Sequence, residues 1–196
     1  MVDDIIEAAK LYIRDLFDGD HSGHDTGHTL RVYRNAMYIA DHEPCDKMTV
    51  ALASLLHDAD DHKLFDTAEN ANARAFLAGR VSEEETERIC AVINSVSFSA
   101  NRGRAPESAE AAVVRDADRL DAIGAVGIAR TFAYGGAHGR SLDESVQHFY
   151  DKLLLLCDEM ITDTARKIAA DRHAFLQNFL DEYRKETDGT GMQSKT

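Results

Sequence analysis

Apolar residues recur along this chain at spacings of three and four, and strict alternation of the β type is hard to find. This period predicts amphipathic helices, the first over residues 5–17 and the second after the polar segment 18–28. A third helix is expected to begin at Asp46, a candidate cap, and to end at His57. The apolar face of the second helix is expected to use Leu30, Tyr33, Met37 and Ala40.

Helix signals continue through the second half of the chain, where two capping boxes, Ser82 with Glu85 and Ser141 with Glu144, mark helix starts. Further helices are expected over residues 66–79, 107–118 or beyond, 141–156 and 163–186. There is no internal repeat and no low-complexity linker. We therefore predict one all-α domain, a helical bundle or orthogonal helix array over residues 1–186, followed by a disordered tail at 187–196.

Composition and charge restrict the possible partners. The 196 residues are 44% hydrophobic, which is typical of a folded globular protein. The formal net charge of −13 argues against nucleic-acid polymers and anionic membranes as partners. A small anionic substrate remains compatible with this charge if a metal ion and local basic residues offset it. A homo-oligomer is left open.

Three cysteines, Cys45, Cys90 and Cys157, lie far apart and form no CxxC pair. Their odd number indicates reduced thiols in a reducing compartment. No signal peptide and no apolar run of about 20 residues is visible, so we expect a cytoplasmic protein.

The stretch ALASLLHDADDHK, residues 51–63, begins as an apolar helix and ends in ionisable side chains. Burying charge is costly unless the charge is paired or bound to a metal, so His57 and Asp58 indicate a ligand. An imidazole with a carboxylate suits Mn²⁺, Fe²⁺, Co²⁺, Ni²⁺ or Zn²⁺. The same dipeptide at His24-Asp25 lies in a polar segment, where a solvated histidine and a helix cap are the simplest interpretation.

Residues 113–127, VVRDADRLDAIGAVG, combine an apolar face with three acids, Asp116, Asp118 and Asp121. The segment should therefore enter the core while carrying carboxylates. Solvated acids balanced by Arg115 and Arg119 are the alternative explanation.

Four segments of this sequence resemble the HD-domain phosphohydrolase superfamily, in particular its small stand-alone bacterial members. They are GHDTGHTLRVYRNA, LLHDADDHK, INSVSFS and RDADRLDAIGAVGIARTFAYGG, in this order. The similarity covers roughly residues 20–185 and implies the HD-type helical fold. Some members hydrolyse nucleoside triphosphates to the monophosphate and pyrophosphate, which implies a nucleotide or another small phosphate ester as the substrate.

The family's H…HD…D signature falls on His28, His57-Asp58 and Asp118. The resemblance implies that these four residues bind one divalent metal ion. Mn²⁺ is the preferred candidate, with Fe²⁺, Co²⁺, Ni²⁺, Mg²⁺ or Zn²⁺ as alternatives. Such an ion would polarise a phosphate and activate a bound water.

Further roles are assigned to residues around this signature. Asp61 follows Asp58 by three residues, where related enzymes place an acid near the attacking water, and Asp60 competes for the role. His24 and Asp25 match the family segment, which implies a supporting role beside the ligands. The candidates for holding substrate phosphates are Lys63, Arg31 and Arg119.

Alternative functions remain open. A regulatory module could keep the metal and nucleotide sites without turnover. A variant of the HExxH protease motif at residues 24–28 is disfavoured, because Asp25 replaces the glutamate and Gly27 falls within the required helix. No histidine lies between Lys63 and Ala117, and no GYP-type motif is visible, which disfavours a two-metal phosphodiesterase.

Overall fold

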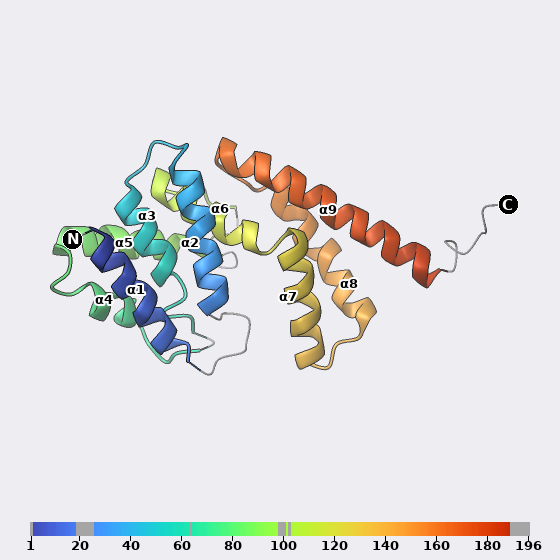
Figure 1. The fold of residues 1–196 in the computed structure, drawn as a ribbon, viewed down its shortest axis with the longest axis horizontal. Coiled ribbons are helices and arrows are strands. Elements are labelled where there is room, and N and C mark those ends of the chain that lie inside the picture. The colour runs from blue at the N-terminus through green and yellow to red at the C-terminus, as the bar shows by residue number, and fades with distance from the viewer. Residues whose placement is uncertain (1, 19–25, 63, 98–100, 102, 189–196) are drawn as a thin grey trace.

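The computed structural model describes residues 2–18, 26–62, 64–97, 101 and 103–188 (Figure 1). Within these residues the chain is helical and contains no strand, which confirms the all-α prediction. The elements are α1 Val2–Leu16, α2 Thr26–Ala40, α3 Lys47–Leu56, α4 Ala71–Leu77, α5 Glu83–Val96, α6 Ala109–Asp121, α7 Gly124–Ala137, α8 Leu142–Asp151, the 3-10 helix η1 Leu153–Cys157 and α9 Asp163–Thr187.

Helix α6 occupies the middle of the molecule. Figure 1 shows α1–α5 on one side of it and α7, α8 and α9 on the other. α6 contacts α2, α3 and α5 and also reaches α9, so it joins both groups of helices. Ten of its residues are buried, charged side chains among them. Functional groups on α6 can therefore face either side of the protein.

Helix α3 is the most deeply buried short helix of the first group. Every residue from Thr49 to Leu56 is buried, and α1, α2, α5 and α6 surround it. A helix that is hydrophobic all round belongs inside a core. Its last residue therefore delivers the following His57 directly into the protein interior.

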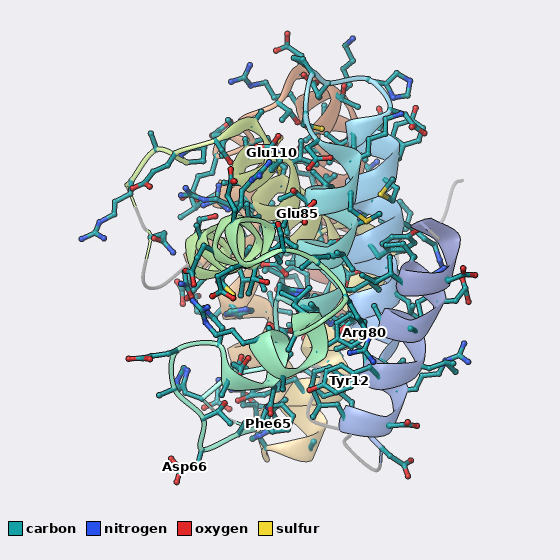
Figure 2. All side chains as sticks on the ribbon, turned by 90° about the vertical axis from the view of Figure 1, so that its left-hand side faces the viewer. Tyr12, Phe65, Asp66, Arg80, Glu85 and Glu110 are labelled. Carbon is teal, nitrogen blue, oxygen red and sulfur yellow. The ribbon has the colours of Figure 1, made fainter. Side chains whose placement is uncertain are left out.

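Three of the helix starts predicted from capping residues are confirmed. Asp46 caps α3 by accepting from the Met48 N–H at 3.1 Å. Both capping boxes form, with Ser82 and Glu85 at α5 and with Ser141 and Glu144 at α8. Glu85 and Glu110, labelled in Figure 2, lie in the first turns of α5 and α6, where the helix dipole stabilises a negative charge.

Two details of the helix predictions were wrong. Helix α4 begins at Ala71 instead of residue 66 or 67, after Asn70 in the left-handed region at φ 58°. α8 ends at Asp151, and a 3-10 helix replaces the end of the expected helix. On α2 the predicted apolar face does pack against the core, with Ala40 buried and Leu30, Tyr33 and Met37 partly buried, beside a more deeply buried set. The buried residues are His28, Thr29, Val32, Ala36, Ile39 and Ala40.

The last helices pack through aromatic side chains. Phe149 of α8 is completely buried, and its ring centroid lies 5.9 Å from that of Phe132 and 6.0 Å from that of Phe179. Helix α9 continues to Thr187, one residue into the expected tail, and residues 189–196 lie outside the described part.

Two further sequence expectations concern the thiols and the membrane. Cys45, Cys90 and Cys157 are all free thiols, as expected. No helix in the described part of the chain combines the length and the apolar character that crossing a bilayer requires.

Candidate metal centre

The ligand atoms of His28, His57 and Asp58 all lie within 4.8 Å of one another, and Asp118 lies beside the two histidines. His28 Nε2 lies 3.4 Å from both Asp58 Oδ2 and Asp118 Oδ1. His57 Nε2 lies 3.3 Å from Asp58 Oδ2 and 4.0 Å from Asp118 Oδ1. Atoms that share one divalent ion at about 2.1 Å lie roughly 3.0–4.2 Å apart. The spacing of these atoms therefore suits a single ion.

Three helices supply these groups. His28 lies in the first turn of α2, His57 follows the last residue of α3, and Asp118 lies in the last turns of α6. The chain turns sharply after α3, with a hydrogen bond of 3.1 Å from the Asp61 N–H to the Asp58 carbonyl. Ending the helix at Leu56 lets two adjacent side chains face the same point, which a continuing helix would place about 100° apart.

The hydrogen bond of His57 selects the tautomer that a metal requires. Its Nδ1 lies 2.9 Å from the Ser54 carbonyl oxygen, so Nδ1 carries the proton and donates it. Its Nε2 is then an acceptor, and it is buried without a hydrogen-bond partner. An unpartnered buried lone pair is costly, and binding a cation would remove that cost.

His28 is oriented in the same way by a carboxylate. Its Nδ1 lies 2.7 Å from Asp121 Oδ2 and donates to it, which turns Nε2 toward Asp58 and Asp118. Arg130 Nη1 also lies 3.1 Å from this Nδ1, but both atoms carry protons, so the contact is no hydrogen bond. A carboxylate behind a histidine is the usual support for a metal-binding imidazole.

The titration behaviour of the cluster shows its affinity for positive charge. Burial disfavours the imidazolium of His28, yet the carboxylates of Asp118, Asp121 and Asp58 outweigh it and raise the pKa of His28 well above its usual value. Burial opposes the charge on His57 too, and Asp58 raises its pKa. A proton thus stabilises the metal-free cluster, and a metal ion would displace it on binding.

The cluster is closed on one side and open on the other. The side chains of His28 and His57 are 3% and 2% exposed, whereas those of Asp58 and Asp118 are 13% and 29% exposed. Solvent and small molecules therefore reach the cluster from the side of Asp118.

Asp121 is a second centre of charge, directly behind His28. Its side chain is 2% exposed and accepts from Arg31 Nε at 2.7 Å and from Arg130 Nη1 at 2.7 Å, in addition to His28. Burial would raise the pKa of Asp121, but the hydrogen bonds from His28 and Arg31 and the charge of Arg130 hold it far below its usual range. Asp121 is therefore a permanent anion.

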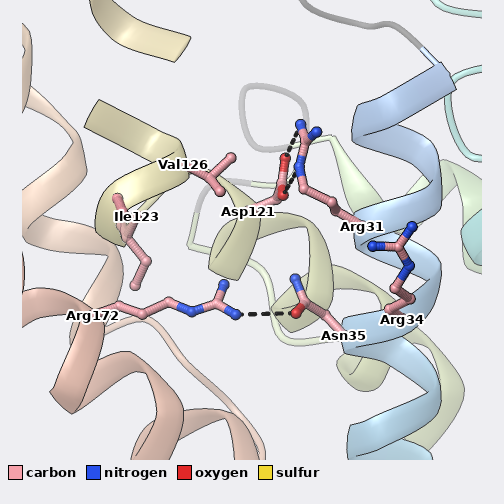
Figure 3. A pocket seen from close by; sticks show the side chains of 8 residues that line it. Arg31, Arg34, Asn35, Asp121, Ile123, Val126 and Arg172 are labelled. Atoms are coloured by element: carbon pink, nitrogen blue, oxygen red, sulfur yellow. Dashed lines mark hydrogen bonds and ion pairs between the residues drawn. The ribbon is translucent and has the colours of Figure 1, made fainter. Parts of the chain in front are cut away.

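A cavity of about 290 Å³ lies beyond Asp121, between α2, the start of α7 and α9 (Figure 3). Three arginines line it, Arg31, Arg34 and Arg172, and Arg31 reaches Asp121 while Arg172 donates to Asn35 Oδ1 at 3.2 Å. Gly124 also lies at this boundary, at φ +75°, and a Cβ there would be 3.1 Å from Cγ of Arg172. The close approach of α7 to α9 thus needs a glycine.

The two candidate bases occupy different environments. Asp60 accepts from the backbone N–H groups of Asn72 and Ala73, at 2.9 and 3.0 Å, so both its oxygens cap α4. Asp61 lies in the turn after Asp58, with its side chain 14% exposed and one oxygen 3.6 Å from His62 Nδ1. Asp60 has a structural task that Asp61 does not share.

Two of the expected phosphate-binding residues, Arg31 and Arg119, lie in different surroundings. Arg31 lies beside the cluster and binds Asp121 with two nitrogens, at 2.7 and 3.1 Å. Arg119 is buried and contacts Glu159, donating to its carbonyl at 2.7 Å and lying 3.1 Å from its carboxylate. Lys63, His24 and Asp25 lie outside the described residues, so their roles stay predictions.

The sequence interpretation missed the structural role of Asp121 and of Arg130. A usable signal existed for Asp121, because it follows Asp118 by three residues and must share its side of the helix. Arg130 had no such signal. It lies on the next helix, and only the turn between α6 and α7 brings it back to Asp121.

A family model for the HD domain matches residues 26–123, which contain all four residues of the cluster. The Bacillus subtilis (strain 168) protein YpgQ, itself uncharacterized, is 40% identical over 193 residues, covering 93% of this chain and 94% of its own length.

Solved structures agree with this match. The crystal structure of Bacillus subtilis YpgQ in complex with ADP superposes with a TM-score of 0.83 at 36% identity, over 95% of this chain and 97% of that one. An HD-superfamily hydrolase from Bacillus thuringiensis has a TM-score of 0.81 at 36% identity, over 96% of this chain and 99% of that one. This chain belongs to the HD domain family.

Proposed function

We propose that this protein is a metal-dependent phosphohydrolase in which His28, His57, Asp58 and Asp118 hold one divalent ion. The observation that carries the proposal is the buried Nε2 of His57, which has no hydrogen-bond partner and lies 3.3 Å from Asp58 Oδ2. The mixed set of imidazoles and carboxylates suits Mn²⁺, our preferred ion, and also Fe²⁺, Co²⁺, Ni²⁺, Mg²⁺ or Zn²⁺. When bound, the ion would activate a water and neutralise phosphate charge.

The proposed substrate is a nucleotide, in the first place a nucleoside or deoxynucleoside triphosphate. Two observations support this choice. YpgQ, which is similar along nearly its whole length, has been crystallised with ADP. The cluster also opens to solvent beside Asp118, and Arg31 and Arg130 lie directly behind it in a chain of net charge −13. Local positive charge of this kind offsets the field that would otherwise repel an anion.

The residues around the ion would divide the remaining work. We assign proton transfer with the attacking water to Asp61, because Asp60 already uses both oxygens to cap α4. Lys63 is proposed to contact the substrate phosphates, and His24 and Asp25 are proposed to support the ligands. Arg31 would act from beside the cluster, while Arg119, held by Glu159, belongs to a different cavity described below.

The test begins with metal-free protein. It is reloaded with Mn²⁺ and given a panel of nucleotides, and phosphate and pyrophosphate are measured separately. The proposal expects turnover that depends on the metal, and loss of both turnover and bound metal in His57→Ala. His42→Ala is the matched control, since this exposed histidine follows the C-terminal end of α2, away from His28 in its first turn, and should leave both unchanged. Undiminished metal binding in His57→Ala would refute the site.

A regulatory module that binds nucleotides without turnover is the second candidate. The ADP complex of YpgQ is compatible with it, because that structure concerns binding. The same experiment distinguishes the two functions. Tight nucleotide binding with no product across several metals would favour the module, while release of phosphate or pyrophosphate would favour the enzyme.

A further inference from the structure

A second cavity lies against α6, separate from the metal cluster. It measures about 390 Å³, within the usual range for small-molecule sites, and lies between residues 103–106, the middle of α6 and residues 159–166. None of the four cluster residues lines it. We call it the arginine cavity, because Arg104, Arg115, Arg119 and Arg166 line it.

The charge of this cavity is opposite to that of the protein. Four arginines face it, and the single acid that lines it is Glu159, in a chain with 35 acids and 22 lysines and arginines. Asp116 and Asp118 on α6 do not line it, and the oxygens of Asp116 already accept from the backbone N–H groups of Ile161 and Thr162. A local excess of positive charge therefore remains to be balanced.

Arg115 forms the floor of the arginine cavity. It is 4% exposed, although it carries a full positive charge. Two of its nitrogens donate to backbone carbonyls, Nη1 to Arg104 at 2.7 Å and Nη2 to Asn101 at 3.0 Å. No carboxylate is among these partners, and the buried Nε has no hydrogen-bond partner. A buried guanidinium balanced only by carbonyls is an incomplete arrangement.

Arg119 lies one helical turn further along α6 and shares this side of the helix. Arg119 is also 4% exposed, and its guanidinium contacts Glu159, with 2.7 Å to the carbonyl and 3.1 Å to the carboxylate. Two cations thus lie close together inside the protein. An anion between them would relieve their mutual repulsion.

The rim of the arginine cavity offers two more guanidinium groups. Arg104 is exposed, and its side chain makes no hydrogen bond or ion pair with any described residue. Arg166 donates Nε to the Met160 carbonyl at 3.1 Å and Nη1 to Asp163 at 2.8 Å, which leaves Nη2 available. Both can close over a ligand from the solvent side.

We propose that the arginine cavity binds a phosphoryl anion, either free pyrophosphate or the phosphate chain of a nucleotide, independently of the metal centre. One guanidinium group can donate two parallel N–H hydrogen bonds to two oxygens of a phosphate. A site with several arginines therefore binds multiply charged phosphates in preference to chloride or acetate. The site goes beyond the proposed hydrolysis, because it needs neither the metal nor Asp61. It lies next to the metal centre along α6, because Arg115 and Arg119 flank Asp118 on this helix, yet none of the four cluster residues lines it.

The test is isothermal titration of pyrophosphate and of ADP into metal-free protein, after the chelator has been dialysed away. The titrations are repeated in the His57→Ala background, so that failure of the metal site cannot be mistaken for failure of this one. Arg104→Ala and Arg166→Ala change only the rim and should not disturb folding. Arg14→Ala removes an exposed charge from α1, and Arg34→Ala removes one from the cavity near Asp121.

We expect pyrophosphate to bind without metal and to bind about tenfold more weakly in Arg104→Ala and in Arg166→Ala, the value of one charge-assisted contact. The two controls should keep the affinity of the unchanged protein. Tighter binding of ADP than of pyrophosphate would identify a nucleotide as the source of the phosphate, and the reverse would identify the free anion. Absence of binding at millimolar concentration, or loss of binding only in Arg34→Ala, would overturn the proposal.

Discussion

His28 Nδ1 lies 2.7 Å from Asp121 Oδ2, although 93 residues separate them in the sequence. This contact connects the metal cluster to the charges behind it, because Arg31 and Arg130 bind the same carboxylate. The carboxylate fixes the tautomer of His28 and increases the basicity of the opposite nitrogen. Asp121 therefore positions His28 within the proposed metal centre.

The first prediction concerns this contact. Asp121→Asn should weaken metal binding by about 10- to 100-fold, the usual effect of removing such a support. The neutral amide stabilises the imidazole less and leaves Arg31 and Arg130 without their anion. Metal affinity is measured by titration calorimetry, with Asp171→Asn on exposed α9 as the control. An affinity equal to that of the unchanged protein would show that Asp121 does not act through His28.

The second prediction is that a metal stabilises the folded protein. The buried Nε2 of His57 gains a partner only when an ion binds, and a ligand that binds only the folded state raises its stability. At a concentration 100 times the dissociation constant, Mn²⁺ should add about 2.7 kcal/mol to the free energy of unfolding. Thermal melts with and without Mn²⁺ measure this gain, which should be absent in His57→Ala and kept in His42→Ala.

The third prediction separates two adjacent acids. Asp60→Ala removes the acceptor for two backbone N–H groups of α4 and should lower the free energy of unfolding by about 0.5–2 kcal/mol. Asp61→Asn should reduce kcat by about 10²- to 10⁴-fold, the range for a lost general base. Each variant is examined by denaturant unfolding and by steady-state kinetics. Full kcat in Asp61→Asn would remove this residue from the mechanism.

The fourth prediction is a pH dependence at Asp46. Hydrogen bonds from Thr49 Oγ1 at 2.6 Å and the Met48 N–H at 3.1 Å lower the pKa of Asp46 and outweigh the effect of burial. An acid whose pKa is lower in the folded state stabilises the fold above its unfolded pKa of about 3.9. This stabilisation is lost as the pH falls through the folded pKa.

The difference in melting temperature between the unchanged protein and Asp46→Ala should therefore be largest near neutral pH and shrink below about pH 4. Asp46→Asn serves as the control, because it keeps a capping oxygen that does not titrate. A difference that stays constant down to pH 3 would mean that the carboxylate charge contributes nothing to the cap.

The fifth prediction concerns the aromatic core of α7, α8 and α9. Phe149→Ala should cost about 3–5 kcal/mol of unfolding free energy, because the ring is completely buried between Phe132 and Phe179. Phe175→Ala is the matched control on α9, where the side chain is 52% exposed and should matter little. Chemical denaturation measures both, and similar losses in the two variants would contradict this account of the core.

Much of the helix prediction could be made from local sequence, because a helix cap depends only on residues within about one turn. Asp46, Ser82 with Glu85, and Ser141 with Glu144 all cap the helices that follow them. Helix α4 shows the limit of such signals. Two plausible capping residues at 66 and 67 precede it, yet it starts at Ala71, where Asp60 from a distant turn supplies the acceptor.

The sequence by itself indicated that His57 and Asp58 need a ligand, because charged groups directly after an apolar helix must be balanced wherever that helix packs. It could not say which residues of α2 are buried most deeply, since both faces carry apolar residues and only packing against α3 and α6 decides between them. Tertiary structure also decided the partners of the acids and arginines on α6. Asp118 faces the metal cluster, Asp121 supports His28, and Arg115 lines a second cavity, because each lies at a different angle around the one helix that contacts both sides of the protein.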